Sequence, residues 1–509
     1  MKIIIVASIV VVLALSPVTE AVSPAPDGGY PGNNTAEGQN ALFSLTTGIF
    51  NTAVGSLSLK RDTIGSGNTA IGAGTLFVNT ADQNTATGLA AFLSNTTGTQ
   101  NTANGALALL NNTEGNFNSA CGAFALFSNT TGTDNTAIGN SALFRNTTGA
   151  QNTATGVSAL ISNSAGNLNT AYGAGALYSN DVGSDNTANG TYALFNNTAN
   201  DNTAVGFNAL ALNTSGDENT ATGMEALYGN TVGGDNTANG SHALSHNDTG
   251  VRNTATGFHA LDFNTNGNRN TAVGDIALFD NTTGSNNTAV GDMALEDNTV
   301  GSNNVALGFL AGSGVTTVDN VIAIGAIAEN VSGTCYIGNI YGQHASNGLP
   351  VIVNPAGKLG TDTSSRRFKE EIQPMGHVSE VLYALKPVLF RYRKEIDPEG
   401  ARQLGLVAED VEKVNADLIV RDREGKPYGV RYDRVNAMLL NEFLKEHKKI
   451  RQLEHAVAQQ RNRFEATVAE LKKEIADVVA RSKDQGHQIE KGRAQVELNN
   501  AAAGRVATK

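Results

Sequence analysis

The chain has 509 residues and a formal net charge of −12, with 56 Gly, no Trp and only 6% aromatic residues. This composition lacks the large side chains that fill a conventional globular core and favours a repeat protein. Residues 34–357 carry 5 Lys/Arg against 21 Asp/Glu, a net of −16, which repels nucleic acid and anionic membranes. From Lys358 onward the balance is 29 against 24, a mixed-sign pattern typical of a solvated helix. We therefore expect no nucleic-acid partner.

The N-terminus predicts export. Met1-Lys2 precedes an apolar run over residues 3–15, and small residues follow at Thr19 and Ala21. This pattern is typical of a secretory signal peptide over residues 1–21, cleaved after Ala21. The run is too short for a membrane span, and we expect no transmembrane segment after signal removal. The predicted localisation is secreted or cell-surface, with residues 22–33 as a Pro- and Gly-containing linker.

A short repeat occupies residues 34–338. The motif Asn-Thr-Ala-x-Gly or a variant recurs every 17 residues, with three slips to 16, and Ala-Leu usually follows it. A period this short predicts one solenoid coil per repeat, with a short Thr-Ala-x strand and Gly and Asn at the corners. Stacking would align identical residues, so Asn and Thr are expected to form ladders along the shaft. At about 4.8 Å per coil, 17 coils would span roughly 80 Å.

Each coil offers only Ala, Leu and an occasional Val or Phe for a core, so association of several chains would cover the remaining apolar positions. The two cysteines, Cys121 and Cys335, match neither a disulfide framework nor a zinc motif, and we expect both to be small buried residues. The repeat resembles the head of trimeric autotransporter adhesins, whose coils form a trimeric left-handed β-roll. The polar stretch 482–509 does not match the membrane anchor that ends those adhesins.

Other motifs in the repeat carry less weight. The segment Gly65–Ala70 looks like a phosphate loop, but no helix follows it, so we interpret it as a solenoid corner. The glycine-rich calcium signature of toxin-type β-rolls is absent, and we assign no metal and no cofactor. A Thr in every coil could instead form a flat ladder that faces ice or a glycan.

Ordinary α/β patterning follows the repeat. Residues 339–363 are interpreted as a neck with a strand at Val351–Val353 and the candidate cleavage site. Within 364–434, we expect a helix over 378–385, strands over 388–392, 404–408, 418–420 and 429–432, and a short helix over 409–414.

This order resembles the self-cleaving intramolecular chaperone domain of phage tail spikes, tail fibres and endosialidases. The resemblance is carried by Ser364 to Lys369, Leu385-Lys-Pro387, Phe390-x-Tyr392, Gly405 to Val411, and Tyr432-Asp-Arg with the helix from Asn436. It covers about residues 361–455. It implies a homotrimeric chaperone that folds the preceding fibre and then cuts itself off.

The resemblance implies that Ser364 is the nucleophile, Lys369 its base, and Thr363–Ser364 the bond attacked. A Ser–Lys pair is a known variant of the catalytic triad, in which the amine takes the hydroxyl proton. Five residues apart, the two share neither a helix face nor a strand face, so a turn or a neighbouring subunit must bring them together. Ser365 stands where the family usually has Asp and is a rival nucleophile. Arg366 and Arg367 could support the site by stabilising an oxyanion, or could be surface charges.

A helix is predicted over 435–485 and a disordered tail over 486–509. One apolar row falls at seven-residue intervals: Phe443, Ile450, Val457, Phe464, Leu471 and Val478. This row predicts a coiled-coil seam and hence self-association, with Glu442, Lys445 and Glu446 on a solvated face.

The predicted architecture is an all-β repeat solenoid, then a small α+β chaperone domain, then a C-terminal coiled-coil helix. The predicted function is an exported fibre or adhesin-like protein with an autoproteolytic chaperone. One alternative is a structural fibre whose tail is an uncleaved trimerisation clamp. Another is a shaft that binds ice, a glycan or another cell-surface target.

Overall fold

The computed structural model describes residues 30–503. The predicted signal peptide and most of the linker lie outside the described residues. The chain forms two compact units, Met1–His344 and Ala345–Lys509, and each is described by itself.

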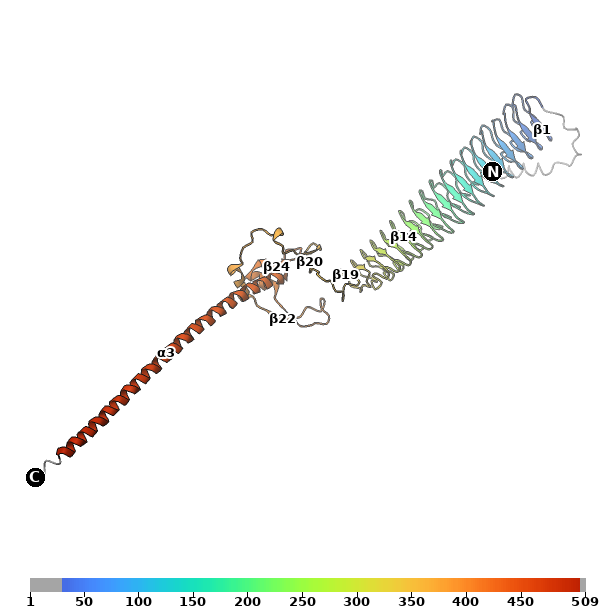
Figure 1. Ribbon diagram of the computed structural model, residues 1–509. Coiled ribbons are helices and arrows are strands. Elements are labelled where there is room, and N and C mark those ends of the chain that lie inside the picture. Colours follow the sequence, from blue (N-terminus) through green and yellow to red (C-terminus); the bar gives the residue numbers. More distant parts are fainter. Residues whose placement is uncertain (1–29, 504–509) are drawn as a thin grey trace. The chain divides into compact units, whose positions relative to one another are not determined.

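The first unit is a solenoid that contributes one three-residue strand per coil to a single 19-stranded sheet (Figure 1). Its strands are β1 Thr35–Glu37, β2 Thr52–Val54, β3 Thr69–Ile71, β4 Thr85–Thr87, β5 Thr102–Asn104, β6 Ser119–Cys121, β7 Thr136–Ile138, β8 Thr153–Thr155, β9 Thr170–Tyr172, β10 Thr187–Asn189, β11 Thr203–Val205, β12 Thr220–Thr222, β13 Thr237–Asn239, β14 Thr254–Thr256, β15 Thr271–Val273, β16 Thr288–Val290, β17 Val305–Leu307, β18 Ile322–Ile324 and β19 Cys335–Ile337. Each strand pairs in parallel with the strand of the next coil, and equivalent residues stand opposite one another, as Thr136 does with Thr153. The predicted repeat solenoid is confirmed.

The core of the solenoid is built from small residues. The middle Ala of each strand points inward, as Ala137 does, and the Ala-Leu pair of each repeat is buried, as Ala142 and Leu143 are. The first and third strand residues lie on the outer face, because side chains alternate along a strand. The predicted Ala/Leu core is confirmed, and it is thin.

Two columns of buried Asn run along the solenoid. In the first, the Asn before each strand accepts the next coil's backbone N–H, as Asn135 Oδ1 does from Asn152 N at 3.0 Å. Its own Nδ2 donates to Gly149 O at 2.8 Å, which closes the corner of its coil. In the second column, Asn146 Nδ2 donates to Asn129 Oδ1 at 2.7 Å. The predicted Asn ladders are present, and they replace the polar partners that water would otherwise supply.

Close stacking explains the repeat glycines. Gly156 has φ +142°, and a Cβ built there would lie 2.3 Å from the carbonyl oxygen of Gly173 in the next coil. Any side chain at this corner would force two coils apart. Cys121 and Cys335, in contrast, are exposed on the outer face of their strands. The expectation that they are buried was wrong, because each occupies an outward position of the strand rather than the central Ala position.

The second unit combines three small antiparallel hairpins with helices. Its elements are β20 Val351–Val353, β21 Leu359–Thr361, the 3₁₀ turns η1 Arg366–Phe368 and η2 Gly376–Ala384, β22 Val388–Phe390, β23 Gln403–Gly405, α2 Ala408–Val414, η3 Ala416–Leu418, β24 Ile419–Arg421, β25 Pro427–Val430 and α3 Tyr432–Ala503. A compact core joins α2, η3, β24 and the first turns of α3 through Val411, Leu418, Ile419, Val435 and Met438.

Two elements differ from the sequence prediction. The expected helix over 378–385 is a 3₁₀ helix, η2, and the long helix extends beyond its predicted end. Helix α3 runs through residues 486–503, which we expected to be disordered (Figure 1). The apolar row stops short of this segment, but its residues include good helix formers such as Ala, Glu, Gln and Lys. Among residues 30–503, no helix is long and apolar enough to cross a membrane.

Candidate functional site

The predicted cleavage site lies in an exposed segment between two ordered elements. Hairpin β20–β21 ends at Thr361, and residues 362–365 have no regular structure. The single 3₁₀ turn η1 follows, closed by hydrogen bonds from Phe368 N to Ser365 O at 3.0 Å and from Lys369 N to Arg366 O at 3.1 Å. The Thr363–Ser364 bond is therefore open to solvent and free of sheet or helix pairing.

The two predicted catalytic residues lie on either side of η1. Ser364 precedes this turn and Lys369 is its C-terminal cap, and both are exposed. Among the residues that the structure describes, no hydrogen bond joins Ser364 to Lys369. A single chain thus supplies a turn between the pair but not the Ser–Lys contact that proton transfer requires.

The predicted supporting residues belong to the same turn. Ser365 is the N-cap of η1 but makes no side-chain cap hydrogen bond. The Arg367 guanidinium lies 4.5 Å from the centroid of the Phe368 ring, a cation–π contact that occupies this cation. Arg366 is exposed. Ser365 is therefore exposed beside Ser364, and of the two arginines only Arg367 makes a ring contact within this turn.

The hairpin before the cleavage site contacts the body of the second unit. Arg423 Nε, in the turn between β24 and β25, donates to Pro355 O at 2.8 Å. A groove of about 590 Å³ lies between the two hairpins, lined in part by Ile352, Leu359, Val420 and Val430. Arg423 and Pro355 lie on opposite sides of the Thr363–Ser364 bond. A cut at this bond would not itself break their noncovalent contact.

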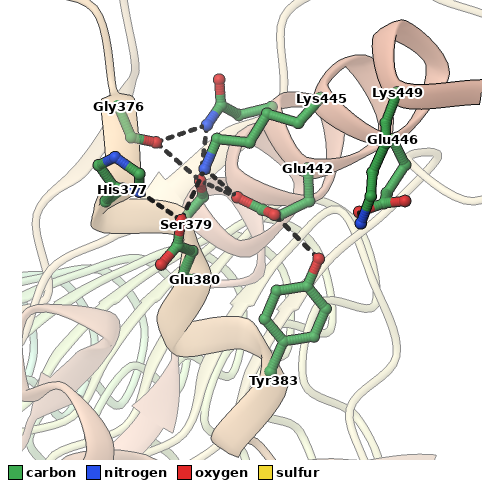
Figure 2. A network of polar contacts seen from close by, with 10 residues as sticks. Gly376, His377, Ser379, Glu380, Tyr383, Glu442, Lys445, Glu446 and Lys449 are labelled. Atoms are coloured by element: carbon green, nitrogen blue, oxygen red, sulfur yellow. Dashed lines mark hydrogen bonds and ion pairs between the residues drawn. The ribbon is translucent and has the colours of Figure 1, made fainter. Parts of the chain in front are cut away.

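A polar network attaches η2 to α3 (Figure 2). The fully buried Ser379 donates its hydroxyl to Glu442 Oε1 at 2.5 Å, and Tyr383 donates to Glu442 Oε2 at 2.9 Å. Lys445 Nζ lies 2.7 Å from Glu442 Oε1, and Asn441 Nδ2 donates to Ser379 Oγ at 2.6 Å. The carboxylate of Glu442 thus accepts hydrogen bonds from three side chains, two of them on η2.

The network shifts the titration of its members. The hydrogen bond from Lys445, followed by that from Ser379, lowers the pKa of Glu442 from 4.5 to about 2. The hydrogen bond to Glu442 raises the pKa of Lys445 and likewise raises the pKa of Tyr383. Glu442 is therefore ionised at neutral pH and anchors η2, which begins seven residues after Lys369, to the helix.

Sequence reasoning missed this network. It assigned Glu442 and Lys445 to a solvated face, but Glu442 is buried. In the sequence, Glu442 and Lys445 look like an ordinary i, i+3 ion pair on a helix. The hydrogen-bond partner Ser379 lies 63 residues before Glu442. No local signal could have linked them.

The predicted helix seam is exposed along α3. Its members Phe443, Ile450, Val457, Phe464, Leu471 and Val478 all lie on the surface. Beyond the first turns of α3, charged side chains near the row pair within the helix, as Arg461 does with Glu465 at 2.8 Å. A single chain leaves this apolar row uncovered.

The described residues contain no group of three or more His, Cys, Asp or Glu placed to hold a metal ion. Around Ser364 the chain offers a hydroxyl, an amine and guanidinium groups, which are groups that acyl transfer can use.

Comparison with known families assigns the second unit. Residues 364–420 match the model of a peptidase family, S74, described as chaperone of endosialidase. The match begins at Ser364 and covers η1, η2, β22, β23, α2, η3 and most of β24. No curated protein and no solved structure matches the chain significantly. Behind its β-solenoid, the chain therefore carries a segment, residues 364–420, that matches the endosialidase-chaperone family.

Proposed function

We propose that this protein is an exported homotrimeric fibre whose C-terminal chaperone domain assembles the shaft and then cuts the chain before Ser364. The observation that carries the proposal is the family match, which begins at the residue that the cut would make the new N-terminus.

The assembly half of the proposal is supported by apolar surface that one chain leaves uncovered. Helix α3 exposes a row of large apolar side chains with a seven-residue spacing, the period of a left-handed coiled coil. The network around Glu442 fixes the start of this helix to the chaperone domain. Association through α3 would therefore bring three chaperone domains, and the shafts attached to them, together.

The cleavage half is supported by an accessible bond beside a Ser and a Lys. Within one chain these two residues are separated by η1 and make no mutual hydrogen bond among the residues described. We propose that assembly completes the pair, so that cutting follows trimer formation. Attack of the Ser364 hydroxyl on the Thr363 carbonyl would pass the hydroxyl proton to Lys369, which returns it to the Ser364 nitrogen as the Thr363–Ser364 amide bond breaks. The resulting ester between Thr363 and Ser364 Oγ would then be hydrolysed by water, which leaves a Thr363 carboxylate on the shaft and a free Ser364 amine.

The test compares full-length protein with Ser364→Ala, Ser365→Ala and Lys369→Ala on a denaturing gel. Wild type and Ser365→Ala are expected to split into a shaft and a fragment that starts at Ser364, whereas the other two stay intact. A denaturing gel separates the two fragments even where noncovalent contacts that span the cut persist, such as that of Arg423 Nε with Pro355 O. Cleavage of Ser364→Ala at the same bond would contradict the assignment of the nucleophile.

The second candidate is an uncleaved trimerisation clamp. It is favoured by the exposed, unpaired geometry of Ser364 and Lys369 and by Ser365 at the family's usual Asp position. Under this alternative all four proteins run as one intact chain, and the tail still holds the copies together.

A further inference from the structure

The outer face of the solenoid sheet is almost free of charge. We call the first and third residues of strands β1–β19 the strand face. Between β2 and β19 this face carries no charged residue, although residues 34–357 contain 21 Asp/Glu and 5 Lys/Arg. Its single charge is Glu37, in the terminal strand β1. Interface cores are depleted of charged residues in the same way.

The strand face is also apolar in one of its two columns. The third strand position holds an apolar residue or Cys121 in 11 of 19 strands. Several are large and exposed: Val54, Ile71, Ile138, Tyr172, Val273, Leu307, Ile324 and Ile337. The first position holds a short Thr or Ser in β1–β16. Thr or Asn interrupts this column in β4, β5, β8, β10 and β12–β14, so the apolar side chains form several short exposed groups along the face. Exposed apolar groups that line up on one uncharged face indicate a contact surface.

A second apolar strip on the shaft is a weaker candidate for contact with another molecule. Its aromatic rings pack against one another within the chain, as Phe127 does on Phe144 at 4.9 Å between ring centroids. Charged residues lie along the same strip, such as Arg61 over Phe77 and Glu296 near the other end. Its apolar groups are already partly covered, and its charges favour contact with water.

We propose that the strand face is the surface through which copies of this chain pack along the shaft, in parallel around a common axis. The charge distribution favours contact between copies on this face, because two shafts of net −16 repel each other least where the contacting surfaces carry no charge. The proposal rests on the self-assembly argued above but not on cleavage.

The dimensions explain why such a shaft needs an assembly domain. Nineteen strands at about 4.8 Å, with two columns about 7 Å apart, present roughly 600 Å² per copy, below the ~800 Å² of a typical stable interface. A repeating face can also slide by one coil and recover most of its contacts. Tethering through α3 would raise the effective concentration of neighbouring faces and set their register.

The thiol of Cys121 can be labelled to measure whether the strand face is covered. It occupies the third position of β6, is exposed in the single chain and stands opposite Ile138 of β7. The test measures maleimide labelling of Cys121 in the full-length protein with Cys335→Ser. The matched control is Thr131→Cys with Cys121→Ser and Cys335→Ser, because Thr131 is exposed in the same coil but off the strand face. The oligomeric mass of each sample is measured by light scattering.

We expect Cys121 to react at least roughly tenfold more slowly than Thr131→Cys in the oligomer, since a covered thiol reacts only when the assembly opens. Ile138→Glu should restore fast labelling of Cys121, whereas Asn140→Glu, exposed in the same coil off the strand face, should not. Equal rates in a confirmed oligomer would overturn the inference and leave the face free for a glycan or ice. A monomeric mass would instead show that the proposed self-assembly fails.

Discussion

At the residue scale, the shaft depends on its buried Asn side chains. Asn135 accepts from Asn152 N at 3.0 Å and donates to Gly149 O at 2.8 Å, so it links two coils and closes its own. The repeat period is a direct consequence of this geometry, which is why the recurring Asn motif located the first 17 strands; the structure adds β18 and β19 beyond the 17 predicted coils, where the motif is degraded. What the sequence did not show is that both Asn columns are fully buried, because Asn is a common residue in exposed turns.

We expect Asn135→Ala to lower the unfolding midpoint of the shaft. The substitution leaves the buried backbone N–H of Asn152 without a partner, at about 1–3 kcal/mol, and removes one of the two side-chain donors to Gly149 O, which keeps Asn146 Nδ2. Circular dichroism during heating measures the change. The control is Asp134→Asn, which alters the neighbouring exposed residue at φ +57° and keeps a residue that tolerates this conformation. Equal midpoints for Asn135→Ala and wild type would show that the Asn column does not hold the coils.

Glu442 is the second critical residue, and its contribution depends on pH. Its pKa falls from 4.5 to about 2 in the folded chain, so its stabilising effect is full above pH 4.5 and is lost as pH falls toward 2. We expect Glu442→Gln to unfold the second unit more easily than wild type at pH 7, and the difference to shrink at pH 3. Glu446→Gln is the control, since Glu446 is exposed one turn further along α3. A pH-independent difference would contradict the ionised network.

At the element scale, periodicity predicted the type of most elements more accurately than their boundaries. The apolar residues of 378–385 share a helical face, but such a pattern does not separate an α-helix from the 3₁₀ helix observed. The two predicted strands of 388–392 and 404–408 are shortened to Val388–Phe390 and Gln403–Gly405. The candidate site was located from its family motif, whereas its surroundings depend on contacts between distant segments that no local pattern encodes.

The exposed row of α3 leads to a prediction about association. Phe464→Asp should reduce the oligomer fraction of the full-length protein, because it places a carboxylate in the apolar seam. Asn462→Asp adds the same charge two residues away, off the seam, and should leave the oligomer unchanged. Analytical ultracentrifugation distinguishes the two. Loss of the oligomer in both variants, or in neither, would contradict a seam centred on this row.

At the scale of the whole molecule, the two units have different roles in the account. The solenoid satisfies its own backbone through parallel strands and Asn ladders, so each coil is well formed within one chain. Its outer strand face and the seam of α3 are not covered within one chain. The chaperone domain lies between these two surfaces in sequence, where it can couple association of the helix to alignment of the shafts.

The central claim is that the C-terminal domain assembles the shaft. The most direct measurement is the native mass of the shaft produced from three proteins: the full chain, full-length Ser364→Ala, and a chain that ends at Thr363. The account predicts oligomeric shafts from the first two and monomers or aggregates from the third. Equal assembly of the chain that ends at Thr363 would contradict it.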